Sequence, residues 1–247
     1  MSSPTLPDWP HLFRPGEADA PVLLTLHGTG GNEQEIARLA SRLDPRAGVL
    51  SPRGRVREQG MARWFRRLSE GVFDVDDVVA RAGELAGFIG AARTHYAIGD
   101  RTLVAVGFSN GANIALATAM LHPDVLSRVV ALSGMLPFAD RDEAVDLHGV
   151  HVTTLNGRED PMAPIDSVVH LVTVLRAKGA DVDLTSETVG TASRRRTWSS
   201  PPRRCVRRAD HLQWGAPGHG VAAVPSGRSE PPEGFASRKL SATSSTG

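Results

Sequence analysis

The fold is decided by ten residues near the middle of the chain, Thr102-Leu103-Val104-Ala105-Val106-Gly107-Phe108-Ser109-Asn110-Gly111. Residues 102–106 form an apolar run that is typical of a buried strand, and residues 113–121 predict a helix that ends before Pro123. Between them, residues 107–111 match the Gly-x-Ser-x-Gly pattern of a nucleophile elbow, in which a sharp strand-to-helix turn exposes a serine hydroxyl. The alternative interpretation is a chance match in a glycine-rich chain. Because both flanking elements fit, we predict that Ser109 is a catalytic nucleophile.

Strand-like and helix-like segments alternate on both sides of this stretch. Apolar runs at residues 21–26, 49–50, 129–132, 152–155 and 182–184 predict strands, and apolar residues at helical spacing predict helices at 32–43, 74–89 and 164–177. Continuous apolar strands separated by helices are typical of a mostly parallel sheet that is covered by helices on both faces. We therefore expect the α/β class, with one domain over residues 1–190.

The composition changes beyond residue 190. Residues 191–247 contain nine arginines and one lysine against three acids, a net charge of +7, whereas the first 190 residues carry a net charge of −6. This segment is rich in Arg, Pro and Ser, and neither helical nor strand periodicity continues into it. Such a composition buries too little apolar surface to offset the entropy of ordering the chain. We therefore interpret residues 191–247 as an irregular basic tail.

The composition also excludes several classes of protein and of site. Hydrophobic residues make up 40% of the 247 residues, which is enough for a sizeable core. The apolar runs fall far short of the roughly 18 residues that a membrane span needs, and residues 1–10 lack the basic and then apolar pattern of a signal peptide. Cys205 is the single cysteine, which excludes an internal disulfide and a multi-cysteine metal site. We expect a cytoplasmic protein without a metal or another cofactor.

A serine nucleophile needs hydrogen-bond donors for the negative oxygen that forms during acyl transfer. One donor is the backbone N–H of Asn110, the residue that follows the predicted nucleophile. The second is expected in the loop after an early strand, where His27-Gly28-Thr29-Gly30-Gly31 follows the run 21–26, and we assign it to the N–H of Thr29. A plain glycine-rich turn is the alternative, and a phosphate-binding loop fits poorly because its Lys-Ser/Thr ending is missing. His27 itself is interpreted as a structural residue.

The acid that supports a catalytic histidine should follow the nucleophile by one or two strands. The predicted strand 152–155 runs into Asn156-Gly157-Arg158-Glu159-Asp160-Pro161, so Glu159 and Asp160 are both candidates. We favour Asp160, because Pro161 stiffens the turn directly after it. The alternative is a solvated acidic loop without a catalytic role.

Four motifs occur in the same order as in a known family. They are Leu26-His27-Gly28-Thr29-Gly30-Gly31-Asn32-Glu33, Ser51-Pro52-Arg53-Gly54, Gly107-Phe108-Ser109-Asn110-Gly111-Ala112-Asn113 and Gly157-Arg158-Glu159-Asp160-Pro161. Together they resemble the phospholipase/carboxylesterase group of α/β-hydrolases, and especially its small bacterial esterases related to dienelactone hydrolases. The resemblance covers roughly residues 10–190 and implies the α/β-hydrolase fold.

The resemblance implies a serine esterase with little or no lid, which hydrolyses carboxylic esters of small molecules through an acyl-enzyme. Ser109 would be its nucleophile, Asp160 its acid, and the N–H groups of Thr29 and Asn110 its oxyanion hole. The segment Gly60-Met61-Ala62-Arg63-Trp64-Phe65 is similar to the family's Arg-Phe-Phe segment near the pocket, with Trp64 in place of the first phenylalanine. That segment either lines the acyl pocket or belongs to the core.

The chain departs from this family at the third member of the catalytic triad. The family places Gly-His-Gln/Arg-Leu about 30 residues after the acid, followed by an amphipathic helix, but this count reaches Gly190 and then Thr191. His170 comes too early, and the later histidines, His211 and His219, both lie in the irregular tail. Without a general base a serine hydroxyl is a poor nucleophile. We therefore expect either impaired activity or recruitment of His211 or His219 as the base.

A shift of reading frame would explain both the missing histidine and the change of composition. Synonymous codons can be chosen for residues 190–204 such that reading from the third base of the Gly190 codon encodes His-Arg-Leu-Thr-Ala-Ala-Asp-Val-Val-Val-Ala-Ala-Ala-Ala. The loss of one cytosine at the Gly190 codon of a gene with that frame would give the present chain. The codons are our choice, and the sequence permits this reading without requiring it. We hypothesise that residues 191–247 are an out-of-frame tail and that the last helix of the fold is missing.

Two functions of other classes compete with the esterase. A hydrolase fold without a base could keep the ester pocket and bind ligands without catalysis. The arginine-rich stretch 194–208 could instead bind nucleic acid or an anionic membrane, but Trp198 is its single aromatic residue, and we expect no nucleic-acid partner. The expected partner is a small-molecule ester. The sequence defines neither the physiological ester, nor the acyl preference, nor the oligomeric state.

Overall fold

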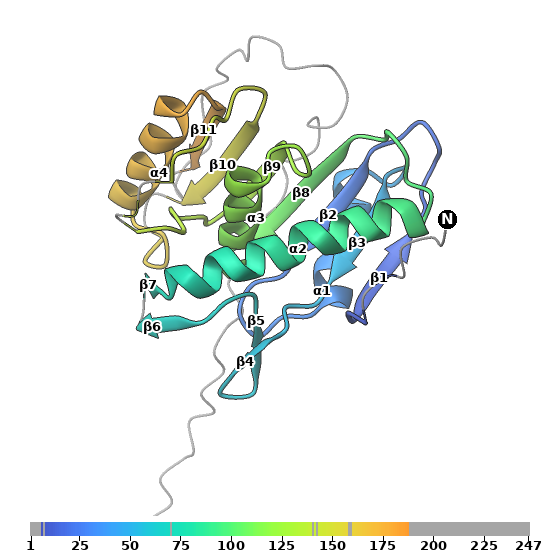
Figure 1. Ribbon diagram of the computed structural model, residues 1–247, viewed down its shortest axis with the longest axis horizontal. Helices are drawn as coiled ribbons and strands as arrows, with labels where there is room; N and C mark the ends of the chain where they lie inside the picture. The colour runs from blue at the N-terminus through green and yellow to red at the C-terminus, as the bar shows by residue number, and fades with distance from the viewer. Residues whose placement is uncertain are drawn as a thin grey trace, which may run out of the picture. The chain divides into compact units, whose positions relative to one another are not determined.

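A seven-stranded sheet organises the part of the chain that the computed structural model describes, which is residues 6, 8–69, 71–139, 141, 143–157 and 160–187 (Figure 1). In spatial order its strands are β1 (His11–Arg14), β3 (Gly48–Pro52), β2 (Val22–Leu26), β8 (Leu103–Phe108), β9 (Arg128–Leu132), β10 (His151–Gly157) and β11 (Asp181–Glu187). β1 is antiparallel to β3, and all the other neighbouring strands are parallel. Because parallel strands present their carboxyl ends at one edge, the loops after β2, β8 and β10 all leave the sheet on the same side.

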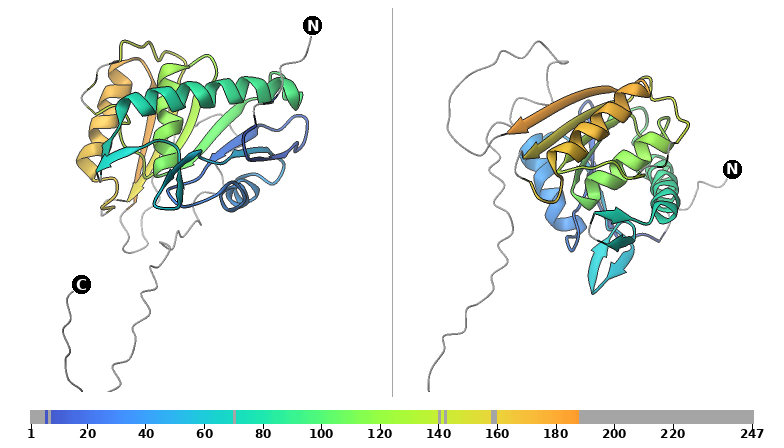
Figure 2. Two further views of the ribbon diagram at one scale, coloured as in Figure 1. Left: turned by 60° about the horizontal axis from the view of Figure 1, so that its bottom comes forward. Right: turned by 90° about the vertical axis from the view of Figure 1, so that its left-hand side faces the viewer.

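The helices connect these strands and cover the two faces of the sheet. Those that the structure describes are α1 (Glu33–Leu43), α2 (Val75–His95), α3 (Asn110–Leu121) and α4 (Ile165–Ala177). α2, α3 and α4 lie on one face, whereas α1 lies on the other, where it contacts β1, β2 and β3 (Figure 2). Two small hairpins, β4 (Val56–Glu58) with β5 (Met61–Arg63) and β6 (Arg67–Ser69) with β7 (Val72–Phe73), occupy the connection between β3 and α2.

Two of the helices begin at polar residues that act as N-caps. The side chain of Asn32 accepts hydrogen bonds from the N–H groups of Gln34 and Glu35 at the start of α1. Asp74 accepts a hydrogen bond from the N–H of Asp77 at the start of α2. Both caps satisfy N–H groups that have no partner within the helix.

α3 lies at the centre of the core, between α2 and the sheet. All of its residues from 110 to 120 are buried, and its four alanines allow the helix to approach neighbouring elements closely. Phe65, Phe88 and Phe138, which are among the largest fully buried side chains, belong to the same core cluster. A helix that is apolar on all sides must be enclosed, and α3 therefore fixes the position of the turn from which it starts.

The two faces of β8, β9, β10 and β11 differ in burial. On the face toward α3 and α4, Ala105, Val129 and Val152 lie in register, and all three are buried. On the opposite face Val106 is buried, whereas the apolar side chains at residues 104, 130, 132 and 155 are half-buried. The described helix on that side, α1, contacts the other end of the sheet. The described residues thus leave one face of this half of the sheet incompletely covered.

The structure confirms the predicted α/β fold and corrects details of it. β1 and the two hairpins were not predicted, because strands of two to four residues with polar positions carry little periodicity. α3 begins at Asn110 rather than near residue 113. The domain boundary near residue 190, the tail 191–247 and the proposed loss of the last helix lie outside the described residues. None of the helices in the described ranges combines the length and apolar character of a membrane span.

Candidate active site

Ser109 occupies a strained turn between β8 and α3. Its backbone angles are φ 51° and ψ −117°, a region that residues with a side chain seldom adopt. The turn is held from both sides, because the N–H of Ser109 donates to the carbonyl of Leu132 (2.8 Å) and its carbonyl accepts from the N–H of Asn113 (3.0 Å). Backbone strain of this kind persists where the surroundings enforce it, and it is common at functional sites.

The glycines on either side of Ser109 are required by close backbone contacts. A Cβ atom at Gly107 would lie 2.4 Å from the carbonyl oxygen of Gly111, and a Cβ atom at Gly111 would lie 2.1 Å from the carbonyl oxygen of Leu26. No side chain fits at such distances. The Gly-x-Ser-x-Gly pattern therefore reflects the close packing of β8, α3 and the end of β2.

Asn110, the first residue of α3, contributes two groups to this region. Its N–H is at the helix start, where no intrahelical acceptor exists, and it forms no hydrogen bond within the described ranges. Its buried side-chain oxygen accepts a hydrogen bond from the N–H of Trp64 at 2.7 Å. Trp64 is itself only 2% exposed, so it belongs to the core, and the alternative that it lines an acyl pocket receives no support.

The loop after β2 packs against the elbow. β2 and β8 are paired up to Leu26 and Gly107, and a Cβ atom at Gly28 would lie 2.8 Å from the ring of Phe108. Thr29 follows at the surface, and its N–H has no acceptor among the described residues. Two N–H groups without acceptors, those of Thr29 and Asn110, are thus carried by segments that flank the turn at Ser109.

The hydroxyl of Thr29 is held by a buried arginine. Arg63 is 3% exposed, and its Nη1 donates to Thr29 Oγ1 at 2.9 Å. Its Nε lies 3.2 Å from Glu58 Oε2, which supplies a compensating charge. The Gly-x-Ser-x-Gly motif gives no signal of this contact, because Arg63 lies on a short hairpin far away in sequence. A charged residue between Ala62 and Trp64, both apolar, was the clue that the sequence offered.

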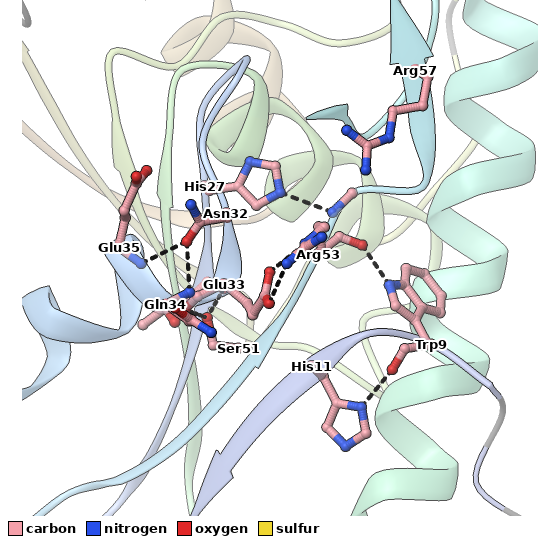
Figure 3. A network of polar contacts seen from close by, with 12 residues as sticks. Trp9, His11, His27, Asn32, Glu33, Gln34, Glu35, Ser51, Arg53 and Arg57 are labelled. Carbon is pink, nitrogen blue, oxygen red and sulfur yellow. Dashed lines mark hydrogen bonds and ion pairs between the residues drawn. The ribbon is translucent and has the colours of Figure 1, made fainter. Parts of the chain in front are cut away.

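His27 supports the same loop and is fully occupied in doing so, and Figure 3 shows its bond to the segment after β3. Its Nδ1 lies 2.7 Å from the carbonyl oxygen of Gly28, and its Nε2 accepts a hydrogen bond from the N–H of Gly54 at 2.9 Å. Burial lowers the pKa of the imidazole, although the bond to Gly28 opposes this shift. Both ring nitrogens are therefore engaged in a neutral ring, which supports the structural role expected for His27 and leaves no nitrogen free to act as a base.

An ion pair fixes the segment that follows β3. Arg53 donates from Nε and Nη2 to the two carboxylate oxygens of Glu33, at 2.5 Å and 2.6 Å. Hydrogen bonding to Arg53 lowers the pKa of Glu33. The carbonyl of Arg53 also accepts a hydrogen bond from Trp9 Nε1 at 2.6 Å. This pairing locks Arg53-Gly54 in place, so that the N–H of Gly54 reaches His27.

Asp160 follows β10 at the same edge of the sheet as Ser109. Only β9 lies between β8 and β10, so the two strands are about 10 Å apart at the usual strand spacing. One carboxylate oxygen of Asp160 accepts a hydrogen bond from the N–H of Met162 at 2.9 Å, and the other has no partner in the described part of the chain. Glu159, the rival candidate, lies outside the described residues.

The direction of β11 determines which part of the chain could supply a catalytic histidine next to Asp160. β11 is parallel to β10, with Glu187 in register with Gly157, so the chain leaves β11 at the edge that carries Asp160. His170 is on α4, where its side chain is exposed, and it does not follow a strand. His211 and His219 lie outside the described residues. In the described residues, the predicted nucleophile, acid and N–H donors therefore lie at one edge of the sheet. No histidine among these residues is placed there to act as the base.

Comparisons with known proteins agree with this geometry. The model of the phospholipase/carboxylesterase family matches residues 9–196. A Bacillus subtilis (strain 168) protein named "Putative hydrolase MhqD" is 40% identical over 174 residues, which are 70% of this chain and 86% of that protein. The carboxylesterase structure from Bacillus cereus is similar, with a TM-score of 0.70 and 37% identity over 76% of this chain and 89% of its own. The carboxylesterase structure from Mesorhizobium loti has a TM-score of 0.67 and 29% identity, and the match covers 78% of this chain and 94% of the other. The chain therefore belongs to the phospholipase/carboxylesterase family of α/β-hydrolases.

Proposed function

We propose that this protein is a serine esterase that hydrolyses carboxylic esters of small molecules through an acyl-enzyme. The observation that carries the proposal is the strained backbone of Ser109 at the carboxyl edge of the sheet. The N–H groups of Thr29 and Asn110 lie on segments that flank this turn, and Asp160 follows two strands away. These are the groups that acyl transfer requires, apart from a base. The cytoplasm is the location that we propose, as the sequence predicts.

The chemistry assigns one role to each group. The Ser109 oxygen attacks the ester carbonyl, and the hydroxyl proton passes to a base that Asp160 orients. The carbonyl oxygen becomes an anion, and the N–H groups of Thr29 and Asn110 donate to it. The anion collapses to the acyl-enzyme while the alcohol leaves with the proton. Water then attacks the acyl-enzyme with the help of the same base, which releases the acid and restores the serine.

We propose that this chain is impaired because it lacks the general base that accepts the serine proton. An imidazole has nitrogen atoms at two ends, so it can bridge a serine and a carboxylate on strands about 10 Å apart. The residue that supplies it should follow β11, where the chain has Gly190 and then Thr191. The described residues leave one face of β8 to β11 incompletely covered, and this supports the frameshift hypothesis. In the alternative frame, an alanine- and valine-rich segment follows the histidine and would provide a helix for that face.

A second candidate function is ligand binding without catalysis. The observation that favours it is the lack of a suitable histidine among the described residues. A fluorophosphonate probe separates the two functions, because it labels only an activated serine. In a chain with the restored histidine described below, we expect labelling that disappears in Ser109→Ala and persists in Ser133→Ala. Ser133 is a matched control, because it also has positive φ (54°) and directly follows β9. A histidine-restored chain that is never labelled would support the binding function, and labelling that survives Ser109→Ala would contradict the assignment of the nucleophile.

Restoring the frame tests the missing base directly. A chain that continues after Val189 with Gly-His-Arg-Leu-Thr-Ala-Ala-Asp should hydrolyse p-nitrophenyl acetate at least about a hundredfold faster than the present chain. The same chain with alanine in place of the new histidine is the control, and it should lose this gain. If the present chain already turns over short esters well, and His211→Ala or His219→Ala abolishes that turnover, the frameshift hypothesis is wrong. A recruited tail histidine would then be the base.

A further inference from the structure

A surface hollow of about 220 Å³ lies beside the segment that joins β3 to β4. It is lined by Pro10, Arg53, Gly54, Arg55 and Arg57, so three of its five lining residues are arginines. The three arginines occupy alternate positions in sequence. Alternate residues of an extended segment point to the same side, which is how this stretch gathers three guanidinium groups around one hollow.

Arg53 forms a rigid, neutralised wall of the hollow. Both carboxylate oxygens of Glu33 accept its hydrogen bonds (2.5 Å and 2.6 Å), and its carbonyl is held by Trp9. Figure 3 shows this pair next to the backbone of the same segment, with Arg57 nearby. Because Glu33 balances the charge of Arg53, the net charge of the hollow is set by the other two arginines.

Arg55 and Arg57 are compensated less completely. The guanidinium of Arg55 lies over the ring of Trp9, 5.2 Å from its centroid, and 3.7 Å from Glu84 Oε2, which is beyond hydrogen-bond distance. Arg57 is exposed and donates to the carbonyl of Gly60 at 3.3 Å. It has no carboxylate within ion-pair distance among the described residues.

The nearest acid in sequence does not neutralise Arg57. Glu58 is the next residue of β4, so its side chain points to the other side of the strand. Its carboxylate pairs there with Arg63 at 3.2 Å and with Arg67 at 2.7 Å. The hollow therefore carries positive charge that the described acids paired with its arginines, Glu33 and Glu84, do not balance.

We propose that this hollow binds the phosphate group of a small molecule. Arginine presents paired N–H donors that match the oxygens of phosphate, and charge-assisted hydrogen bonds of this kind are the strong ones. A phosphate monoester carries close to two negative charges and three acceptor oxygens, so it can engage more than one guanidinium. The hollow has room for about seven water molecules at about 30 Å³ each, which accommodates a phosphate and a few further atoms.

The test is a titration of the full chain with inorganic phosphate, followed by NMR at constant ionic strength. One reporter is the backbone N–H of Gly54, which lines the hollow. The other is the indole N–H of Trp9, which donates to the carbonyl of the lining residue Arg53. We expect saturable shifts of both signals. Arg57→Gln should weaken the affinity at least about tenfold, because it removes a charged hydrogen-bond donor.

The matched control is Arg38→Gln, which removes the same charge from an exposed arginine of α1. It should leave the affinity unchanged, and equal urea midpoints would show that both variants fold. Shifts that never saturate, or an equal loss in both variants, would overturn the proposal. Vesicles of phosphatidylglycerol distinguish a lipid headgroup from a free phosphate. Arg57-dependent sedimentation with them, without shifts from inorganic phosphate, would overturn the assignment to a small molecule.

Discussion

Replacing a glycine by alanine should stabilise the protein in one helix, α2, and destabilise it in another, α3. Gly111 and Gly90 are both helical glycines, and alanine in a helix is intrinsically more stable by roughly 0.5–1 kcal/mol. A Cβ atom at Gly90 meets nothing within 4 Å. A Cβ atom at Gly111 would lie 2.1 Å from the carbonyl oxygen of Leu26 and 2.5 Å from that of His27. Gly90→Ala should therefore stabilise the protein, and Gly111→Ala should destabilise it.

The size of the Gly111→Ala effect follows from what must move. A carbon atom normally approaches a carbonyl oxygen no closer than about 3.3 Å, so the end of β2 and the start of α3 must separate by about 1 Å. Both are backbone segments that are paired or buried, and overpacking of this kind costs roughly 1–3 kcal/mol or more. For a chain of this size that corresponds to a fall in melting temperature of roughly 2–12 °C, against a rise of about 1–4 °C for Gly90→Ala.

Urea denaturation followed by far-UV circular dichroism measures both changes. In a chain with a restored histidine, the rate at which a fluorophosphonate labels Ser109 provides a second readout. This rate should fall in Gly111→Ala and stay unchanged in Gly90→Ala, because only the former displaces the turn. A Gly111→Ala protein as stable as the unsubstituted chain would refute the close approach of α3 to β2, and with it our explanation of the Gly-x-Ser-x-Gly pattern.

Three further predictions concern residues around the turn. Because burial lowers the folded-state pKa of His27, the unfolded chain takes up a proton that the folded one excludes. Stability should therefore fall as pH drops below about 6.5. Urea midpoints between pH 8 and pH 5 measure this fall, which should be smaller in His27→Gln, and a flat profile would contradict it. In a chain with a restored histidine, Arg63→Met removes the donor to Thr29 Oγ1 and should lower kcat for p-nitrophenyl acetate about tenfold with little change in KM. Thr29→Val should lower kcat by a similar factor. If the losses of the two single variants added fully in the double variant, the contact between Arg63 and Thr29 would not contribute to catalysis. Asp160→Asn should cost far more activity than Glu159→Gln in a chain with a restored histidine, and the opposite ranking would transfer the acid role to Glu159.

Several features of the site were predictable because they depend on local sequence. The turn at Ser109 needs a glycine on each side and a strand and a helix around it, and all of these are contiguous in the chain. The N-caps Asn32 and Asp74 act on N–H groups two or three residues away. Interactions of such short range leave a pattern that can be recognised without knowledge of the fold.

Other features depend on segments that meet only after folding. Arg63 and Thr29 are 34 residues apart, and their contact exists because a hairpin packs against the loop after β2. The bond between His27 and Gly54 and the burial of Trp64 have the same origin. Hydrophobic periodicity reports which face of an element is buried but not which partner it meets, so these contacts could not be predicted from the sequence.

The sequence by itself determined the α/β class, the order of the motifs and the residue types of the proposed nucleophile, acid and N–H donors. It also exposed the change of composition at residue 190, because net charge and periodicity need no coordinates. Only the tertiary structure decided that β8 and β10 have a single strand between them, that both nitrogens of His27 are occupied, and that three arginines surround one hollow. The physical reason is that strand order and side-chain contacts are set by the packing of distant segments around a shared core, whereas motifs and caps are set by neighbours along the chain.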